Sequence, residues 1–259
     1  MSQPVGIDGV KKRLGEVLDW SLESKSRLGY FAALCRRMLF QIEEEIQAGR
    51  FDDGACVERM MVACLNRYLE ALQAYQEGQT LSLAWKETFQ STESRRRLVF
   101  QDLLLGLNAS INFDLGIAAA DVLRPGQVMA MQEDFQRLEE IFCSLASQVR
   151  REIQGISPWL KPLDRLGKRK PHRFAQFNLS AACQSAWKVA RDLAVLNSQQ
   201  KQELIQVLDR RVANLVRLPE GRGFLQRPLI WLARRRESRD VRRNIKTLSH
   251  ISLPQAAQA

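Results

Sequence analysis

The chain has 259 residues, of which 45% are hydrophobic and 26% are charged, and its formal net charge at pH 7 is +10. These values are ordinary for a globular protein, and they exclude a disordered, collagen-like or disulfide-stapled chain. We expect a single domain over residues 1–250, followed by a disordered tail over 251–259.

Apolar residues recur at three- and four-residue spacing along most of the chain, which is the pattern of α-helices that bury one face. No segment keeps the alternation of a β-strand. The sequence therefore predicts an all-α fold, a bundle-like domain of seven or eight helices around a buried central helix at 94–123. The other segments are helices at 8–20, 27–48, 55–76, 80–90, 127–153, 175–195 and 199–217, a Pro-rich loop or hinge at 155–174, and a basic C-terminal segment at 227–249.

The N-terminal segment and the cysteines indicate in which cellular compartment the protein is expected. "MSQPVGIDGVKKRLGE" lacks the apolar core of a signal peptide, and no stretch has the roughly 18 uncharged apolar residues of a membrane-spanning helix. The five cysteines are far apart and odd in number, as expected for buried thiols in a reducing compartment. We expect a cytoplasmic protein, with a peripheral membrane position as the alternative.

The stretch "GLNASINFDLGIAAADVL" at 106–123 places four polar side chains in an apolar helix. On a wheel of 100° per residue, Asn108 and Asn112 lie on one side, and Ser110 and Asp114 lie on the other. Apolar residues surround them, so the helix is expected at the centre of the bundle. Burying an unpaired amide costs about 1–3 kcal/mol, so other helices, water, a ligand or an ion must meet these groups.

Polar residues of two other helices are the expected partners. Asn66 and Glu70 lie four residues apart on the third helix, with Arg67 and Tyr68 beside them. A later helix, "SAWKVARDLA", adds an aromatic ring and a cation. Two interpretations stay open: these groups satisfy one another and fix helix register, or they line a pocket in the bundle core.

The pocket interpretation assigns specific roles. The ligand-binding candidates are Asn66, Tyr68, Asn108, Ser110, Asn112, Trp187 and Arg191. If the protein is an enzyme, Asp114 is the candidate base and Glu70 the candidate second acid, because a buried carboxylate acquires a raised pKa. The wheel argues against this arrangement, since Asp114 faces away from the two asparagines.

Three segments in this order carry a family resemblance: "RYLEAL", "GLNASINFDLGIAAADVL" and "AWKVARDLA". They resemble the uncharacterised bacterial helical family called domain of unknown function 5995, over about residues 28–248. The hallmark of that family is a His-Ile-Asn-x-Asp-Leu run, which reads "SINFDL" at 110–115 here. The resemblance implies a helical fold and, in the family, a histidine and an aspartate on one helix face. Ser110 removes that imidazole, and no activity is implied.

Several kinds of chemistry are excluded by the residues present. The two histidines, His172 and His250, lie in the Pro-rich connection and the tail, so a histidine-dependent triad, a zinc site or a di-iron bundle lacks its ligands. No phosphate-binding glycine motif occurs, and "EGRG" at 220–223 is typical of a turn. We expect no metal site, and the sequence assigns no cofactor.

Charge is distributed unevenly. Residues 1–149 hold 16 Lys and Arg against 21 Asp and Glu, whereas residues 150–259 hold 23 against 8. The basic segment is either a solvated face that pairs with the acidic half, or a docking site for an acidic protein or an anionic membrane. Nucleic acid is the least favoured partner, because no helix-turn-helix signature accompanies the arginines. These arginines are Arg234, Arg235, Arg236, Arg239, Arg242 and Arg243.

The leading hypothesis is therefore an uncharacterised helical protein whose core pocket binds or transforms a small molecule, including an apolar one. The alternative is a non-catalytic binding or scaffold protein that docks an acidic partner or membrane through its basic segment. A cavity reached by the polar groups of the central helix favours the first hypothesis over the second.

Overall fold

The computed structural model describes residues 6–94, 97–124, 126–157, 178–217, 235 and 237–249. Within these residues the protein is all-α and has no strand, as predicted. It has ten helices when α5, η1 and α6 are counted as one, more than the seven or eight expected. Their bounds are α1 Ile7–Ser24, α2 Gly29–Gln47, α3 Gly54–Gln76, α4 Leu83–Glu93, α5 Val99–Ala109, η1 Ser110–Leu115, α6 Gly116–Val122, α7 Gln127–Ala130, α8 Gln132–Ile153, α10 Leu179–Ala194, α11 Ser198–Arg217 and α13 Val241–Ser249.

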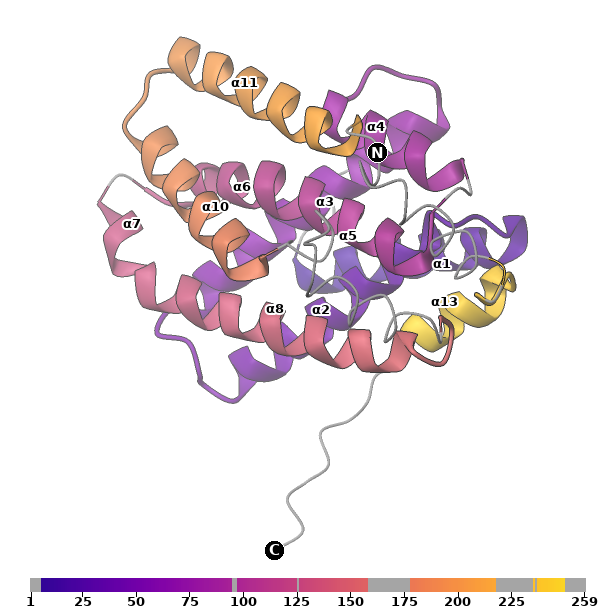
Figure 1. Cartoon of the computed structure of the whole chain (residues 1–259). Coiled ribbons are helices and arrows are strands. Elements are labelled where there is room, and N and C mark those ends of the chain that lie inside the picture. The colour runs from indigo at the N-terminus through magenta and orange to yellow at the C-terminus, as the bar shows by residue number, and fades with distance from the viewer. Residues whose placement is uncertain are drawn as a thin grey trace, which may run out of the picture.

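The central helix of the bundle is the continuous run α5–η1–α6 (Figure 1). It contacts α2, α3, α4, α8, α10 and α11, so the predicted central helix is confirmed. It begins at Val99 and not near residue 94, because Leu98 is extended and its N–H donates to Gln101 Oε1 at 2.7 Å. A side-chain bond of this kind satisfies one of the free N–H groups at a helix start.

The same helix is long and apolar enough, by length and composition, to cross a membrane. It spans Val99–Val122, and it is the one such helix in the described part of the chain. This helix carries Asp102, Asp114 and Asp121, so it does not contradict the expectation that no run of about 18 uncharged apolar residues occurs. Length and overall composition alone would still permit a membrane span. However, 89% of its most apolar window is buried inside the protein, so the composition reflects packing against neighbouring helices.

Two glycines let neighbouring helices approach the central helix closely. A Cβ on Gly116 would lie 2.5 Å from the carbonyl oxygen of Ala186 on α10. A Cβ on Gly106 would lie 2.4 Å from the ring of Phe31 on α2. Neither glycine has room for a side chain, so α10 crosses α6 directly and the Phe31 ring lies against the α5 backbone.

The C-terminal helix α13 packs against α1, α2 and α8. Asn244 is buried there and donates to the Tyr30 hydroxyl at 3.3 Å and to the Ser238 carbonyl at 2.9 Å. Of the predicted C-terminal segment, residues 227–234 and 236 lie outside the described residues. Residues 158–174 of the predicted hinge and the tail at 251–259 lie outside them as well. The division into a single domain stays a prediction.

Candidate functional site

The motif stretch of the central helix forms a π-helical turn at Ser110–Leu115. Such a turn contains one extra residue, which widens the helix locally, and it occurs frequently at functional sites. Within this turn Asp114 is 1% exposed. Its carboxylate accepts hydrogen bonds from Arg67 Nε at 2.8 Å and from Trp85 Nε1 at 2.6 Å. Both oxygens are therefore occupied by side chains of α3 and α4.

The protonation of Asp114 reflects this environment. Burial raises the pKa of Asp114 to about 6, because the charged form is desolvated, while Arg67 and the Trp85 hydrogen bond act in the opposite direction. Arg67 is the cation that pairs with the Asp114 carboxylate, at an Nε–Oδ1 distance of 2.8 Å. The arrangement holds three helices together, and it offers no free carboxylate oxygen to a substrate.

The other polar residues of the motif helix are also engaged. Asn112 Nδ2 donates to Asn108 Oδ1 at 3.0 Å, along one side of the helix. The Ser110 hydroxyl lies 3.7 Å from Cys64 Sγ, in a buried contact between η1 and α3. Ser110 also lines a mainly apolar cavity of about 10 Å³, enough for one water-sized guest, together with Cys35 and Cys64.

The remaining candidates are dispersed. Glu70 and Arg191 are exposed, so neither reaches the core. Asn66 Oδ1 and Trp187 Nε1 are buried and lack a hydrogen-bond partner. The Trp187 ring packs against Phe135 with a centroid separation of 4.7 Å. The candidate set predicted from the sequence therefore does not converge on one cavity.

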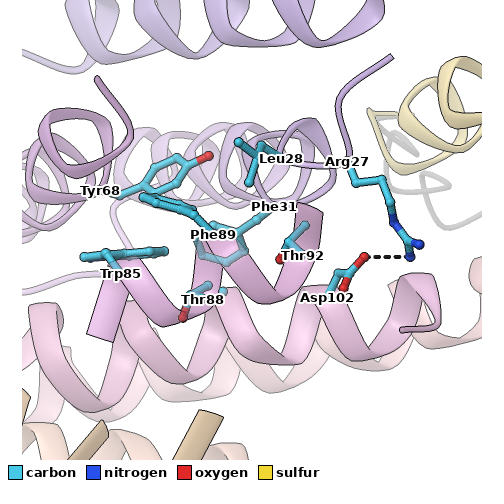
Figure 2. Close-up of a pocket in the computed structure, with 10 residues that line it drawn as sticks. Arg27, Leu28, Phe31, Tyr68, Trp85, Thr88, Phe89, Thr92 and Asp102 are labelled. Carbon is cyan, nitrogen blue, oxygen red and sulfur yellow. Dashed lines mark ion pairs between the residues drawn. The ribbon is translucent and has the colours of Figure 1, made fainter. Parts of the chain in front are cut away.

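A second cavity is lined by Tyr68, one of the predicted ligand-binding residues, and it lies between α2, α3, α4 and α5 (Figure 2). Its free space is also about 10 Å³. The aromatic wall is tightly packed: the Tyr68 and Trp85 rings are 5.1 Å apart, and Trp85 stacks on Phe89 at 5.1 Å. The lining residues are Arg27, Leu28, Phe31, Tyr68, Trp85, Thr88, Phe89, Thr92, Asp102 and Gly106.

Polar atoms in this lining lack partners. The hydroxyls of Tyr68 and Thr88, Oδ1 of Asp102 and Nε of Arg27 are buried without a hydrogen bond. The exposed fractions are 1% for Tyr68, 2% for Thr88 and 3% for Asp102. An unsatisfied buried polar atom costs about 1–3 kcal/mol, so these four atoms need hydrogen-bond partners that neighbouring protein groups do not supply and that water or a ligand can provide.

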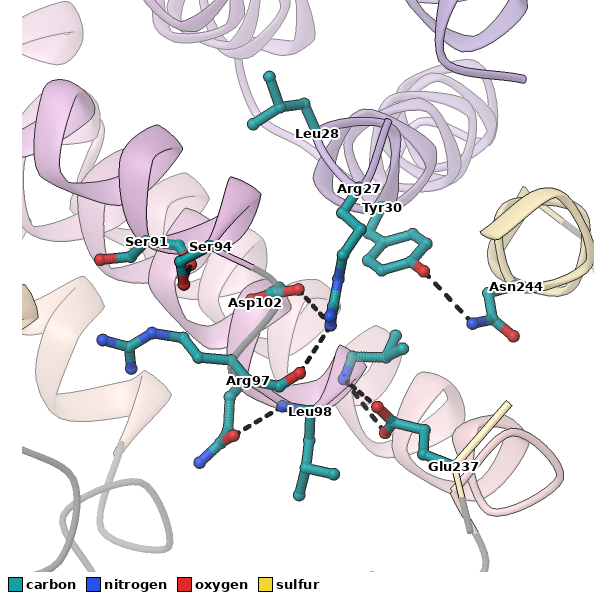
Figure 3. A network of polar contacts seen from close by, with 12 residues as sticks. Arg27, Leu28, Tyr30, Ser91, Ser94, Arg97, Leu98, Asp102, Glu237 and Asn244 are labelled. Atoms are coloured by element: carbon teal, nitrogen blue, oxygen red, sulfur yellow. Dashed lines mark hydrogen bonds and ion pairs between the residues drawn. The ribbon is translucent and has the colours of Figure 1, made fainter. Parts of the chain in front are cut away.

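Asp102 and Arg27 are the charged residues of the cavity lining (Figure 2), and both belong to a network of polar contacts (Figure 3). Asp102 Oδ2 lies 2.6 Å from Arg27 Nη2, in an ion pair that lacks the alignment of a hydrogen bond. Arg27 Nη2 also donates to the Arg97 carbonyl at 2.8 Å. Glu237, from the C-terminal segment, accepts the N–H of Val99 at 3.1 Å with each of its oxygens. Burial raises the pKa of Asp102 to about 8, against the attraction of Arg27 and Arg97.

Sequence reasoning missed Asp102, Arg27 and Thr88. A signal was present for Asp102, because it is the one charged residue in the apolar run "LVFQDLLLG" at 98–106. A second signal was the 85, 88, 89, 92 spacing on α4, which places two aromatic rings and two threonines on one helix face. The motif at 110–115 directed the sequence prediction to later turns of the same helix, and those candidate residues stay a prediction.

The basic C-terminal segment is described only in part. Arg234 and Arg236 lie outside the described residues, whereas Arg235, Arg239, Arg242 and Arg243 are exposed. Arg242 Nε donates to the carbonyl of Leu22 on α1 at 2.7 Å. In the part of the chain that the structure describes, no three His, Cys, Asp or Glu residues gather to hold a metal ion.

Comparison with known proteins gives one match. The model of a family of unknown function, DUF5995, matches residues 7–218. No curated protein and no solved structure matches the chain. The match covers all the helices that line both cavities, and it ends before α13.

Proposed function

We propose from the geometry that this chain, which belongs to the DUF5995 family of unknown function, binds a small molecule in the cavity lined by Tyr68 and Asp102. Membership of the family implies no activity. The observation that carries this proposal is the set of buried, unpartnered polar atoms around an aromatic wall. Small-molecule sites combine apolar walls with a few polar groups that fix orientation.

The size of the cavity defines what binding requires. The free space of about 10 Å³ holds one water-sized guest. A larger ligand therefore enters only when α4 moves outward, because α4 supplies Trp85, Thr88, Phe89 and Thr92 to the lining. Because only the open molecules bind the ligand, the apparent affinity equals the affinity of the open form multiplied by the fraction of molecules that are open.

Native mass spectrometry of the protein, purified gently from its own cells, tests this proposal. We expect a small-molecule adduct that is lost in Thr88→Leu, because the larger side chain fills the cavity. Thr80→Leu is the matched control, since Thr80 is exposed in the connection before α4. An adduct that survives Thr88→Leu contradicts the proposed location. Absence of any adduct, together with absence of binding by small aromatic probes, contradicts the function itself.

A second candidate function concerns the basic segment. α13 buries Asn244, Ile245 and Leu248 against the bundle, and it leaves Arg242 and Arg243 exposed. Because the apolar side of this helix already packs on protein, docking to an acidic protein or an anionic membrane surface would be electrostatic and not insertional. Co-sedimentation with anionic vesicles should then weaken with salt and in Arg239→Glu with Arg243→Glu. Binding that is indifferent to both contradicts this candidate.

A further inference from the structure

The N-terminus of the central helix is held by a carboxylate from the other end of the chain. α5 begins at Val99, whose N–H has no acceptor within the helix. Both oxygens of Glu237 accept this N–H, each at 3.1 Å (Figure 3). Val99 is 1% exposed and Glu237 is 9% exposed, so the contact is buried. The N-terminus of a helix carries a partial positive charge and free N–H groups, and it therefore favours an anion.

Arg27 adds a full positive charge at the same end of the helix. Its Nη2 donates to the carbonyl of Arg97, two residues before Val99, at 2.8 Å. The Arg27 side chain is 10% exposed, and its Nε lacks a hydrogen-bond acceptor. A buried guanidinium N–H of this kind is a second donor, besides the helix N–H, for an anion at this place.

The charges around this end of α5 depend on Glu237 for their balance. Burial raises the pKa of Asp102, Arg27 and Arg97 lower it, and Glu237 raises it, so the four charged groups lie close enough to act on one another. Arg27 and Arg97 are cations, whereas Asp102 carries one negative charge or, when protonated, none. Among these groups the cations outnumber the carboxylates in both forms of Asp102 if Glu237 is removed. An anion in its place restores the balance.

Glu237 reaches α5 because the backbone beside it is fixed by other helices. The Ser238 N–H donates to the carbonyl of Ile156, which follows α8, at 2.9 Å. Asn244 Nδ2, from α13, donates to the Ser238 carbonyl at 2.9 Å. Residues 237–249 also lie beyond residues 7–218, the part of the chain that the family model matches. The carboxylate is therefore supplied to the central helix by a separate C-terminal segment.

We propose that the N-terminus of α5 and Arg27 form a carboxylate-binding site, that Glu237 is its internal ligand, and that a small external carboxylate binds there when Glu237 is withdrawn. In the structure the C-terminal segment at 237–249 blocks this site. The inference goes beyond the proposed function and does not rest on it, because it requires neither the aromatic cavity nor an outward movement of α4.

Acetate is the probe that fits the site when the Glu237 carboxylate is removed. Glu237→Ala deletes Cγ and the carboxyl group, which together have the shape of acetate. Thermal unfolding of the full chain is followed at neutral pH in sodium acetate and in sodium chloride of equal ionic strength, so that general screening is the same. Glu237→Gln is the filled-site control, because its amide oxygen still accepts the Val99 N–H. Glu140→Ala removes an exposed carboxylate from α8.

We expect acetate to raise the unfolding midpoint of Glu237→Ala by at least about 2 °C over chloride, because a ligand that binds only the folded protein stabilises it. The unsubstituted chain should show no such difference, since its tethered carboxylate outcompetes a free one. Glu237→Gln and Glu140→Ala should show none either. If Glu237→Ala is unfolded in chloride, acetate should restore its helical circular dichroism.

Two results overturn the inference. The first is an equal midpoint of Glu237→Ala in the two salts, or an unfolded chain in both. The second is a rise of the same size in Glu237→Gln or Glu140→Ala, because acetate then binds elsewhere. Neither result decides the proposed function, which the native adduct and its loss in Thr88→Leu test separately.

Discussion

Asp102 and Asp114 are two buried carboxylates of one helix, and they differ in how many hydrogen bonds their oxygens accept from the protein. Asp114 receives hydrogen bonds on both oxygens, from Arg67 and Trp85. Asp102 has one oxygen in an ion pair with Arg27 and the other without a partner. Burial is nearly the same for both, so burial alone does not mark a binding site. The remaining hydrogen-bonding capacity distinguishes them, and the predictions below test that distinction.

The largest expected effect is the loss of stability in Asp114→Ala. Removing the carboxylate leaves the Arg67 guanidinium and the Trp85 indole N–H without their buried partner. The Arg67 side chain is 31% exposed, so water compensates part of the loss, and the expected cost is about 2–4 kcal/mol of unfolding free energy. Urea denaturation measures the difference. The control is Asp19→Ala at an exposed position of α1, which should change stability by about 0.5 kcal/mol or less. A loss below about 1 kcal/mol in Asp114→Ala contradicts a structural role for Asp114.

The second prediction concerns the pH dependence of stability. The pKa of Asp102 is raised to about 8 and that of Asp114 to about 6, from an ordinary value of 3.8. The folded protein therefore holds these protons more tightly than the unfolded chain, and the unfolding free energy falls as pH rises. Both carboxyls contribute between pH 4 and 6, whereas only Asp102 of the two contributes between pH 6 and 8.

Asp102→Asn should therefore remove a fall of about 2–3 kcal/mol between pH 6 and 8. In Asp114→Asn the unfolding free energy should still fall between pH 6 and 8. The part of its fall between pH 4 and 6 that Asp114 contributes should be lost. Chemical denaturation at a series of pH values measures both profiles. An unchanged slope between pH 6 and 8 in Asp102→Asn would show that Asp102 titrates normally.

The third prediction asks whether the π-helical turn has room for a histidine at position 110, the residue that the family resemblance led us to expect there. Ser110 is 4% exposed, contacts Cys64 Sγ and borders a cavity of about 10 Å³. An imidazole exceeds this space, so Ser110→His should lower the unfolding free energy by about 1–3 kcal/mol through overpacking. Ser110→Ala, which removes only the hydroxyl, is the control and should cost less. Unchanged stability in Ser110→His would mean that the π-helical turn still accommodates the ring.

The smallest expected effect has the opposite sign. The hydroxyl of Tyr68 is buried without a partner, so Tyr68→Phe should leave stability unchanged or raise it by up to about 1 kcal/mol in ligand-free protein. The matched control is Tyr75→Phe, where the hydroxyl donates to Glu93 at 2.6 Å. Thermal denaturation compares the two. A Tyr68→Phe loss larger than that of Tyr75→Phe would reveal a partner for the Tyr68 hydroxyl.

Much of the fold follows from the periodicity of the sequence. The apolar spacing of the third helix predicts 55–76, and α3 spans Gly54–Gln76. Apolar residues on all sides of the stretch around residue 110 predict a buried central helix, which the structure confirms. The π-helical turn was not predictable, because a wheel of 100° per residue assumes regular α-helical geometry. The start at Val99 was missed because it depends on the side chain of Gln101.

The candidate site was less predictable than the fold. The predicted site was centred on the polar residues of the motif stretch, and the structure engages those residues with one another or with side chains of neighbouring helices. Trp85 was missed as the partner of Asp114, because that contact joins α4 to η1 across the bundle. Arg27 and Asp102 lie far apart in sequence, and periodicity carries no information about which polar groups meet.

The most direct test of the central claim is a crystal structure of the protein purified gently from its own cells. The account predicts electron density for a bound molecule larger than water at the cavity, in hydrogen-bond contact with Asp102 Oδ1 or with the hydroxyl of Tyr68 or Thr88. The account is contradicted if no such density is present, or if Asp102, Tyr68 and Thr88 are all satisfied by protein groups.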